Sequence, residues 1–346
     1  MQNPYNPNFG IKPQEYITRT EQFNAITRQF DADLPASHIY TLIGLRGSGK
    51  TVMLSELSSC YHTKKEWIVI NLSPDTDMIG DIRFMLNRAV HPLNGVHSSV
   101  SVATPVGGIS VSRDSSSEAG AGIYPLLEQV GKKHRKVLFL VDEVVSNPSV
   151  KAFASYFQIW LREEYPVYLV MAGLYENIQD LKNEKSLTFL YRAPKIMLTP
   201  LSLAPIVANY RKVFQISQEE ALKMARLTKG YAFAFQSLGA VHWDHPDLSF
   251  EEQLSLYDAV LAENVYEKIW SELSRRDRQV VRVISGGKTS ASEIRDALKM
   301  SSQLYNVYRK RLMDQGIVSG AVRGQVTLTL PRFDRFIALY CPEEAD

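Results

Sequence analysis

The stretch of sequence that decides the fold is Gly44-Leu45-Arg46-Gly47-Ser48-Gly49-Lys50-Thr51, which fits the phosphate-binding pattern G-x-x-x-x-G-K-[ST] at every fixed position. An apolar, β-branched run at residues 39–43 precedes it, and a helical pattern at residues 52–57 follows it. A strand, a loop and a helix in this order are the context in which the pattern binds phosphate. The weaker alternative is a Gly/Ser turn that happens to end in Lys-Thr.

Each residue type in such a loop has a physical role. Glycines let backbone N–H groups approach phosphate oxygens closely, and the following helix presents its positive N-terminal end to the same anion. The Lys50 ammonium reaches the β- and γ-phosphates, and the Thr51 hydroxyl is a ligand for Mg²⁺. The nucleotide-binding residues predicted from the loop are Gly44, Arg46, Gly47, Ser48, Gly49, Lys50, Thr51 and Val52.

The second half of a nucleotide site is predicted downstream of the loop. Residues 137–141 form a continuous apolar run, typical of a central strand covered on both faces, and Asp142 and Glu143 follow it. We expect this strand to lie beside the strand at residues 39–43, so that Asp142 holds Mg²⁺ through water. Glu143 would orient and deprotonate the attacking water. An acidic turn that caps a buried strand is the alternative.

Length and composition exclude several classes of protein. The 346 residues are enough for two or three domains, and 39 Lys and Arg against 37 Asp and Glu give no global charge that argues for nucleic acid or membrane. The two cysteines, Cys60 and Cys341, exclude a disulfide framework and a four-cysteine zinc site. Neither a signal peptide nor an apolar run of about 18 residues is visible, so we expect a cytoplasmic protein without a membrane span.

Strands and helices alternate in the first 200 residues. The expected strands are at residues 39–43, 67–72, 137–141, 167–173 and 195–198, and helices are expected at residues 21–30, 77–90, 123–134 and 150–164. This alternation predicts an α/β fold, a three-layer parallel sheet of the P-loop NTPase type with the nucleotide at its carboxyl edge. Residues 94–122 interrupt it, and their Ser, Gly and short alternating runs predict an inserted β-hairpin.

The remaining chain is predicted to be mainly helical. Helices at residues 203–214, 217–228 and 230–240 form a helical lid, and the second begins with a capping box of Ser217 and Glu220. Helices at residues 277–284, 291–300 and 302–315 followed by strands at 317–318 and 326–330 describe a winged helix. The predicted domains are therefore a P-loop domain (1–200), a helical lid (201–250) and a winged-helix domain (251–346).

Together these motifs resemble a known group of proteins. The loop, the 137–143 strand, the 169–174 strand, the Phe-Leu-Tyr-Arg-Ala run at 189–193 and the 198–201 exit look like bacterial AAA-type ATP-binding proteins. These are similar to archaeal ATPases and origin-binding initiators of the AAA+ and STAND class, and the likeness covers nearly the whole chain. The resemblance implies an AAA+-like fold and hydrolysis of ATP with Mg²⁺.

The resemblance also implies roles for residues outside the loop. Ile17 and Arg19 would flank the adenine, with Thr18 where relatives often have Gly. Arg192 falls in the arginine-finger region and would act on the nucleotide of a neighbouring subunit, which implies a homo-oligomer. The alternative for Arg192 is an ion pair within its own subunit.

The sensor residues of the family are not evident in this chain. Ala172 and Gly173 at the end of the fourth strand have no side-chain donor, although Asn177 lies a few residues later. The lid has Gly-Tyr-Ala at residues 230–232, and no Arg follows that would act as a second sensor. The missing sensors suggest slow hydrolysis and use of ATP as a switch.

The partner of the winged helix is open between two classes. Residues 302–335 contain six Arg or Lys and two Asp, a local charge of +4 that suits phosphate contacts. The candidate contacts to duplex DNA are Arg309, Lys310, Arg311 and Arg323. Winged helices also serve as protein-interaction modules, so the alternative is a regulatory ATPase whose winged helix contacts a protein.

Overall fold

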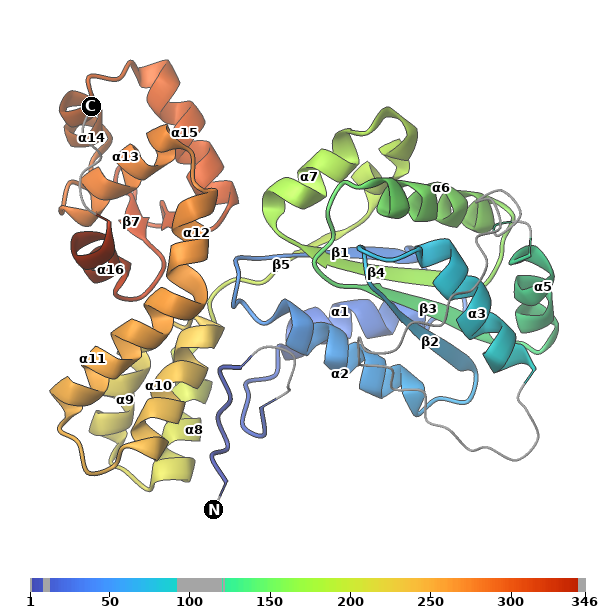
Figure 1. The fold of residues 1–346 in the computed structure, drawn as a ribbon, viewed down its shortest axis with the longest axis horizontal. Coiled ribbons are helices and arrows are strands. Elements are labelled where there is room, and N and C mark those ends of the chain that lie inside the picture. The colour runs from blue at the N-terminus through green and yellow to red at the C-terminus, as the bar shows by residue number, and fades with distance from the viewer. Residues whose placement is uncertain (1, 9–12, 92–119, 121, 342–346) are drawn as a thin grey trace.

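The computed structural model describes residues 2–8, 13–91, 120 and 122–341. Nearly all of the hairpin predicted at residues 94–122 lies outside these described residues. Figure 1 shows two parts, a sheet covered by helices on the right and a helical part on the left that ends in the C-terminal segment. In the part of the chain that the structure describes, no helix is both long enough and apolar enough to cross a bilayer.

A five-stranded parallel sheet forms the first part, in the order β2-β3-β4-β1-β5. The strands are β1 (Ile39–Ile43), β2 (Trp67–Leu72), β3 (Lys136–Val141), β4 (Val167–Gly173) and β5 (Lys195–Met197). All five occur where the sequence predicts them. The expectation that the Asp142 strand borders the loop strand is wrong, because β4 pairs with both β1 and β3 and separates them.

Helices cover both faces of the sheet, which confirms the three layers (Figure 1). On one face lie α1 (Thr20–Phe30) and α2 (Lys50–His62), which pack on Leu138 and Leu140 of β3. The other face carries α3 (Met78–Val90), α5 (Tyr124–Lys132), α6 (Pro148–Arg162) and α7 (Tyr175–Asn183). These helices pack on Phe139 and its neighbours of the same parity, because successive side chains of a strand point to opposite faces.

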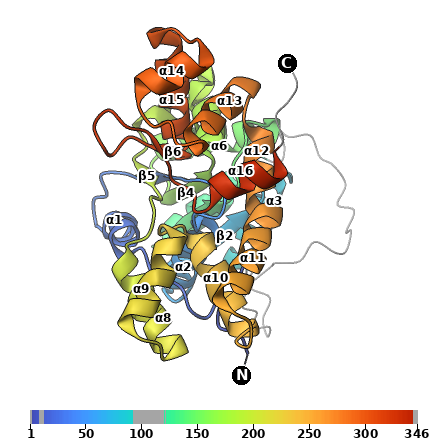
Figure 2. The ribbon, with the colours of Figure 1, turned by 90° about the vertical axis from the view of Figure 1, so that its left-hand side faces the viewer.

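The helical part begins after η1 (Lys185–Arg192) and β5. It contains α8 (Leu203–Phe214), α9 (Gln218–Thr228), α10 (Ala232–Asp244), α11 (Phe250–Leu261), the π-helical turn η2 (Ala262–Tyr266) and α12 (Glu267–Glu272). The predicted capping box at the start of α9 is present, since Ser217 Oγ accepts from the Glu220 amide and the Glu220 carboxylate accepts from the Ser217 amide. In Figure 2, α8, α9 and α10 lie together at the bottom of the view, near the N-terminus of the chain.

The C-terminal segment contains three helices and a short hairpin at the predicted positions. They are α13 (Arg275–Ser285), α14 (Ala291–Leu298), α15 (Ser302–Asp314), β6 (Val318–Ser319) and β7 (Thr327–Leu328), followed by α16 (Phe333–Tyr340). β6 and β7 are antiparallel, which is the arrangement expected of a winged helix. One apolar cluster runs from Ile206 in α8 to Cys341, so α8 to α16 share a continuous core.

Candidate nucleotide-binding site

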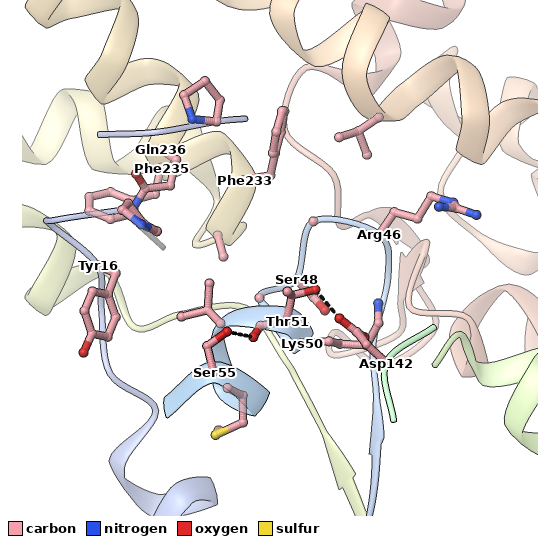
Figure 3. A pocket seen from close by; sticks show the side chains of 18 of the residues that line it. Tyr16, Arg46, Ser48, Lys50, Thr51, Ser55, Asp142, Phe233, Phe235 and Gln236 are labelled. Atoms are coloured by element: carbon pink, nitrogen blue, oxygen red, sulfur yellow. Dashed lines mark hydrogen bonds between the residues drawn. The ribbon is translucent and has the colours of Figure 1, made fainter. Parts of the chain in front are cut away.

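The phosphate-binding pattern forms a turn between β1 and α2 at the carboxyl edge of the sheet (Figure 3). Gly47 has φ +69° and Gly49 has φ +93°, values in the left-handed region that glycine adopts without a steric penalty. Gly49 is the residue that caps the N-terminus of α2. The turn therefore leads directly into the N-terminus of α2, a 13-residue helix whose positive end attracts anions.

Lys50 folds back across this loop. Its ammonium donates to the carbonyl oxygens of Gly44 at 3.0 Å and Leu45 at 2.9 Å, and the side chain is almost fully buried. Burial lowers the pKa of Lys50 to about 8, and the nearby Asp142 carboxylate opposes part of that shift. A buried cation with only carbonyl partners gains strongly from an incoming anion, which suits a phosphate ligand.

Thr51 and Asp142 meet at the predicted metal position. The Thr51 hydroxyl donates to Asp142 Oδ2 at 2.6 Å, and Asp142 Oδ1 accepts from the Glu143 amide at 2.9 Å. Hydroxyl and carboxylate oxygens are the hard ligands that Mg²⁺ prefers, and Mg²⁺ is usually held by one or two such groups plus phosphates and waters. The donor set therefore fits this ion.

Glu143 lies directly after the metal position in an uncommon backbone conformation. Its φ of +50° is in the left-handed region, and its side chain is exposed. The amide of the next residue, Val144, donates to the Ala172 carbonyl of β4 at 2.9 Å, which ties the turn to the sheet. Strained backbone of this kind is concentrated at functional sites, where the surrounding structure holds it in place.

A cavity of about 370 Å³ extends from the loop to the helical part (Figure 3), a size typical of ligand pockets. It is lined by the loop, by Asp142 and Glu143, by the N-terminal leader, by α10 and by η2. Asn177 in α7 also lines it, so a polar side chain is present near the place where the family sensor was not evident. Asn264 and Val265 of η2 were not foreseen, because nothing in their local sequence points to the site.

The predicted adenine-flanking residues border the cavity, but they differ in what they do. Ile17 lines the wall beside Tyr16. Arg19 donates to the Thr199 carbonyl at 2.7 Å and to the Ser48 carbonyl at 3.0 Å, and burial lowers its pKa. Arg19 therefore connects the loop to the segment after β5, and its guanidinium is already engaged by two carbonyls.

The N-terminal leader also belongs to the site, which the sequence pattern did not indicate. Gln236 of α10 holds it from both sides, because its Oε1 accepts from the Asn6 amide at 3.0 Å and its Nε2 donates to the Glu15 carbonyl at 2.7 Å. Tyr5 is buried in the lid, and its hydroxyl donates to Asn209 at 2.7 Å. Asn8 and neighbouring leader residues thereby face the cavity.

Two predicted cations lie outside the cavity, Arg192 at the end of η1 and Arg311 in α15. Arg192 is exposed at the end of η1 and does not line the cavity of its own subunit. Among the described residues it has no ion-pair partner, so the alternative of an internal ion pair is not found. Arg311 is paired with the buried Asp277 and donates to Ser274, so it is not the free DNA contact that was expected.

Arg46 is the loop residue whose side chain leaves the loop. Its guanidinium reaches α12 and forms an ion pair with Glu272, with a distance of 2.9 Å between Nη2 and Oε1. Its carbonyl accepts a hydrogen bond from the Tyr231 hydroxyl, and the Phe233 amide donates to the Gly47 carbonyl at 3.0 Å. The loop is thus in direct contact with both the lid and the C-terminal half.

Two solved structures resemble this chain over nearly its whole length. The chain aligns with the Walker-type ATPase PABY2304 of Pyrococcus abyssi at 14% identity, covering 94% of this chain and 97% of that one with a TM-score of 0.66. It aligns with the ORC2 protein of Aeropyrum pernix in its ADPNP and ADP complexes at 14% identity, covering 96% and 95% with a TM-score of 0.61.

By sequence, only the C-terminal part of the chain matches a family model. Residues 263–337 match a family model described as a domain of unknown function, DUF8462, and the comparison with curated proteins finds no match. Together with the five-stranded parallel sheet and the phosphate-binding loop, these two solved structures show that the chain has a P-loop ATPase fold.

Proposed function

We propose that this protein binds and slowly hydrolyses ATP, and that its nucleotide state controls the C-terminal segment. The observation that carries the proposal is the 2.6 Å contact between Thr51 and Asp142 beside the buried Lys50, at the carboxyl edge of the sheet. The nucleotide complexes named for the ORC2 protein of Aeropyrum pernix, which has the same fold, support it.

The residues divide the chemistry between them. Lys50 would exchange its two carbonyl partners for β- and γ-phosphate oxygens, and amides of the loop would donate to the same phosphates. Thr51 and Asp142 would hold Mg²⁺, which neutralises charge on the phosphate oxygens when it is bound. Glu143, exposed beside the cavity, would position the attacking water and accept its proton.

Slow turnover is proposed because the lid offers no cation to the transferring phosphoryl group. The lid residues that line the cavity are Leu201, Ala232, Phe233, Phe235 and Gln236, and none of them is cationic. Asn177, which also lines the cavity, is proposed as a polar group that contacts a terminal phosphate or the water. A cation aimed at the transferring phosphoryl group is worth a factor of about 10³ to 10⁵ in turnover, so its absence from these lid positions favours a switch.

Arg192 is proposed to supply that cation from a neighbouring subunit, so slow turnover is proposed for the subunit by itself. It lies at an exposed turn outside its own cavity. A homo-oligomer in which this turn faces the next cavity would complete the site.

The C-terminal segment has two proposed partners, and the surface of α15 favours the second. Duplex DNA would use the exposed Lys310 and Arg323 with the half-buried Arg309. A protein partner is favoured by Leu304 and Val307, which are 42% and 60% exposed on the same helix. Apolar side chains so exposed are better buried against a protein than against phosphates.

One experiment separates these partners. ATP turnover of the full chain is measured with and without duplex DNA, at low and at moderate salt. Stimulation that fades with salt would support the DNA-binding function, because counterion release makes such binding salt-dependent. Slow turnover with tightly retained nucleotide and no effect of DNA would support a switch that contacts protein. No turnover and no binding of ATP would refute the proposed function.

A further inference from the structure

Arg46 occupies an unusual position for a residue of a phosphate-binding loop. Arg46 lines the cavity, yet its guanidinium forms an ion pair with Glu272, with Nη2–Oε1 at 2.9 Å and Nε–Oε2 at 3.4 Å. In Figure 3 the guanidinium points away from Lys50 and Thr51. Lys268 shares the same carboxylate at 3.5 Å, so Glu272 has a second cation available when Arg46 leaves.

Two carboxylates, those of Glu272 and Glu143, interact with the charge of Arg46. Glu272 raises the pKa of Arg46 most strongly, through a direct hydrogen bond, and Glu143 raises it further through charge alone. Arg46 and Glu143 line the same cavity, and Glu143 is the residue proposed to face the attacked phosphate, so we place the terminal phosphate of a bound triphosphate between these two side chains. A triphosphate would bring new negative charge close to both Arg46 and Glu272.

The helix that carries Glu272 is also part of the cavity wall. η2 is a π-helical turn that supplies Asn264 and Val265 to the cavity and continues directly into α12. Single π-helical turns within helices occur frequently at functional sites. A ligand that fills the cavity would therefore contact the segment that leads into the helix of Glu272.

Two further contacts hold the C-terminal segment against α7. Gln315 Nε2 donates to Glu176 Oε1 at 2.5 Å, and the Tyr175 hydroxyl donates to Asp314 at 3.2 Å. With the Arg46–Glu272 pair, they are polar contacts near the surface. Contacts of this kind contribute little individually, so an incoming charged ligand can change their balance.

We propose that Arg46 exchanges partners with the state of the nucleotide. Without nucleotide, or with a diphosphate, it binds Glu272 and holds α12 on the loop. With ATP it binds the terminal phosphate, and the charge of that phosphate repels Glu272. α12 and the C-terminal segment are then released from the loop, and Glu272 keeps Lys268. This inference rests on the proposed ATP site and names the residue that distinguishes three phosphates from two.

The size of the effect follows from the exposure of the pair. The side chains of Arg46 and Glu272 are 34% and 33% exposed, and ion pairs of this kind contribute at most about a fivefold change in an equilibrium. Removal of the charge in Glu272→Gln should therefore raise affinity for a triphosphate about two- to fivefold, while affinity for ADP changes less. The matched control is Glu267→Gln, the same substitution on the same helix.

The experiment measures binding of ADP and of the imido analogue of ATP to the full chain. The three proteins are the wild type, Glu272→Gln and Glu267→Gln. We expect the ratio of the two affinities to shift toward the triphosphate in Glu272→Gln alone. Equal ratios in all three proteins would overturn the exchange while leaving the ATP site intact. Failure of the wild type to bind either nucleotide would overturn the proposed function, and the exchange with it.

A second readout follows the release of α12 itself. Hydrogen exchange of the amides of α12 and α15 should become faster in the wild type when the imido analogue of ATP is added, and less so with ADP. In Arg46→Met the faster exchange should be present without nucleotide. Unchanged exchange in Arg46→Met would show that the pair does not hold α12 and would overturn the proposal.

Discussion

Replacement of Gly47 by alanine tests how the loop and the lid are held together. Gly47 has φ +69°, and a Cβ at this position would lie 2.4 Å from the Tyr231 hydroxyl and 2.7 Å from Phe233 Cβ. Neither atom moves easily, because Tyr231 is buried and the Phe233 amide is bonded to the Gly47 carbonyl. We expect Gly47→Ala to push the start of α10 away from the loop.

Gly49 provides a matched control for the magnitude. It also has a positive φ, +93°, but the nearest atom to an added Cβ is Ala232 Cβ at 3.8 Å. Both substitutions carry the left-handed penalty of roughly 1–2 kcal/mol, whereas Gly47→Ala alone adds the overpacking, typically about 1–3 kcal/mol. The difference between the two variants should therefore be about 1–3 kcal/mol.

The assay is hydrogen exchange of the Phe233 amide in the nucleotide-free protein, because that N–H donates directly to the Gly47 carbonyl. Exchange in Gly47→Ala should be faster than in Gly49→Ala by the factor that corresponds to this difference. Equal protection of Phe233 in the two variants would refute the claim that contact at Gly47 joins the loop to the lid.

Three further predictions follow from buried or shared polar groups. Lys182 is buried without a hydrogen-bond partner among the described residues, and burial, aided by Lys195, lowers its pKa from 10.5 to about 8. Between pH 8 and 10.5 the unfolded chain binds more protons than the folded chain, so the free energy of unfolding should rise over this range. Lys182→Met should remove that rise. The same variant should be more stable than the wild type at pH 7, by about 1–3 kcal/mol, as measured by urea titration. Gln236→Leu should weaken ATP binding severalfold, measured by calorimetry, because two hydrogen bonds of roughly 1 kcal/mol each to the leader are lost. Unchanged affinity would show that the leader is not part of the nucleotide site. If the C-terminal segment binds DNA, Lys310→Ala should lower the salt dependence of binding by about one counterion. Arg311 is already paired with Asp277, so it should contribute to folding stability and not to DNA binding. Equal salt slopes for the wild type and Lys310→Ala would contradict the DNA contact of Lys310.

The strands could be predicted because of where they lie. Strands such as β3 and β4 are covered on both faces, so they are continuous apolar runs bounded by polar turns. The order of the strands could not be predicted, since placing β4 between β1 and β3 depends on crossovers that leave no local pattern. α7 and α12 were missed because they are short and polar, with few apolar positions to mark a period.

Some residues of the candidate site could also be predicted from the sequence, and others could not. Lys50, Thr51 and Asp142 were predicted because the phosphate-binding pattern dictates residue types at fixed spacing, and the structure brings them together. Gln236 and Glu272 were missed, since each acts through a contact to a residue more than 200 positions away in the chain. Such contacts follow from the packing of the lid and C-terminal segment on the loop, which no short motif specifies.

The most direct test of the central claim is equilibrium binding of ATP with Mg²⁺ to the wild type and to Lys50→Ala, measured by calorimetry on the full chain. Lys50 is the buried cation that faces the phosphates in this account, so the wild type should bind and the variant should lose measurable binding while keeping its fold by circular dichroism. Retained affinity in a folded Lys50→Ala protein would contradict the claim that this loop is the nucleotide site.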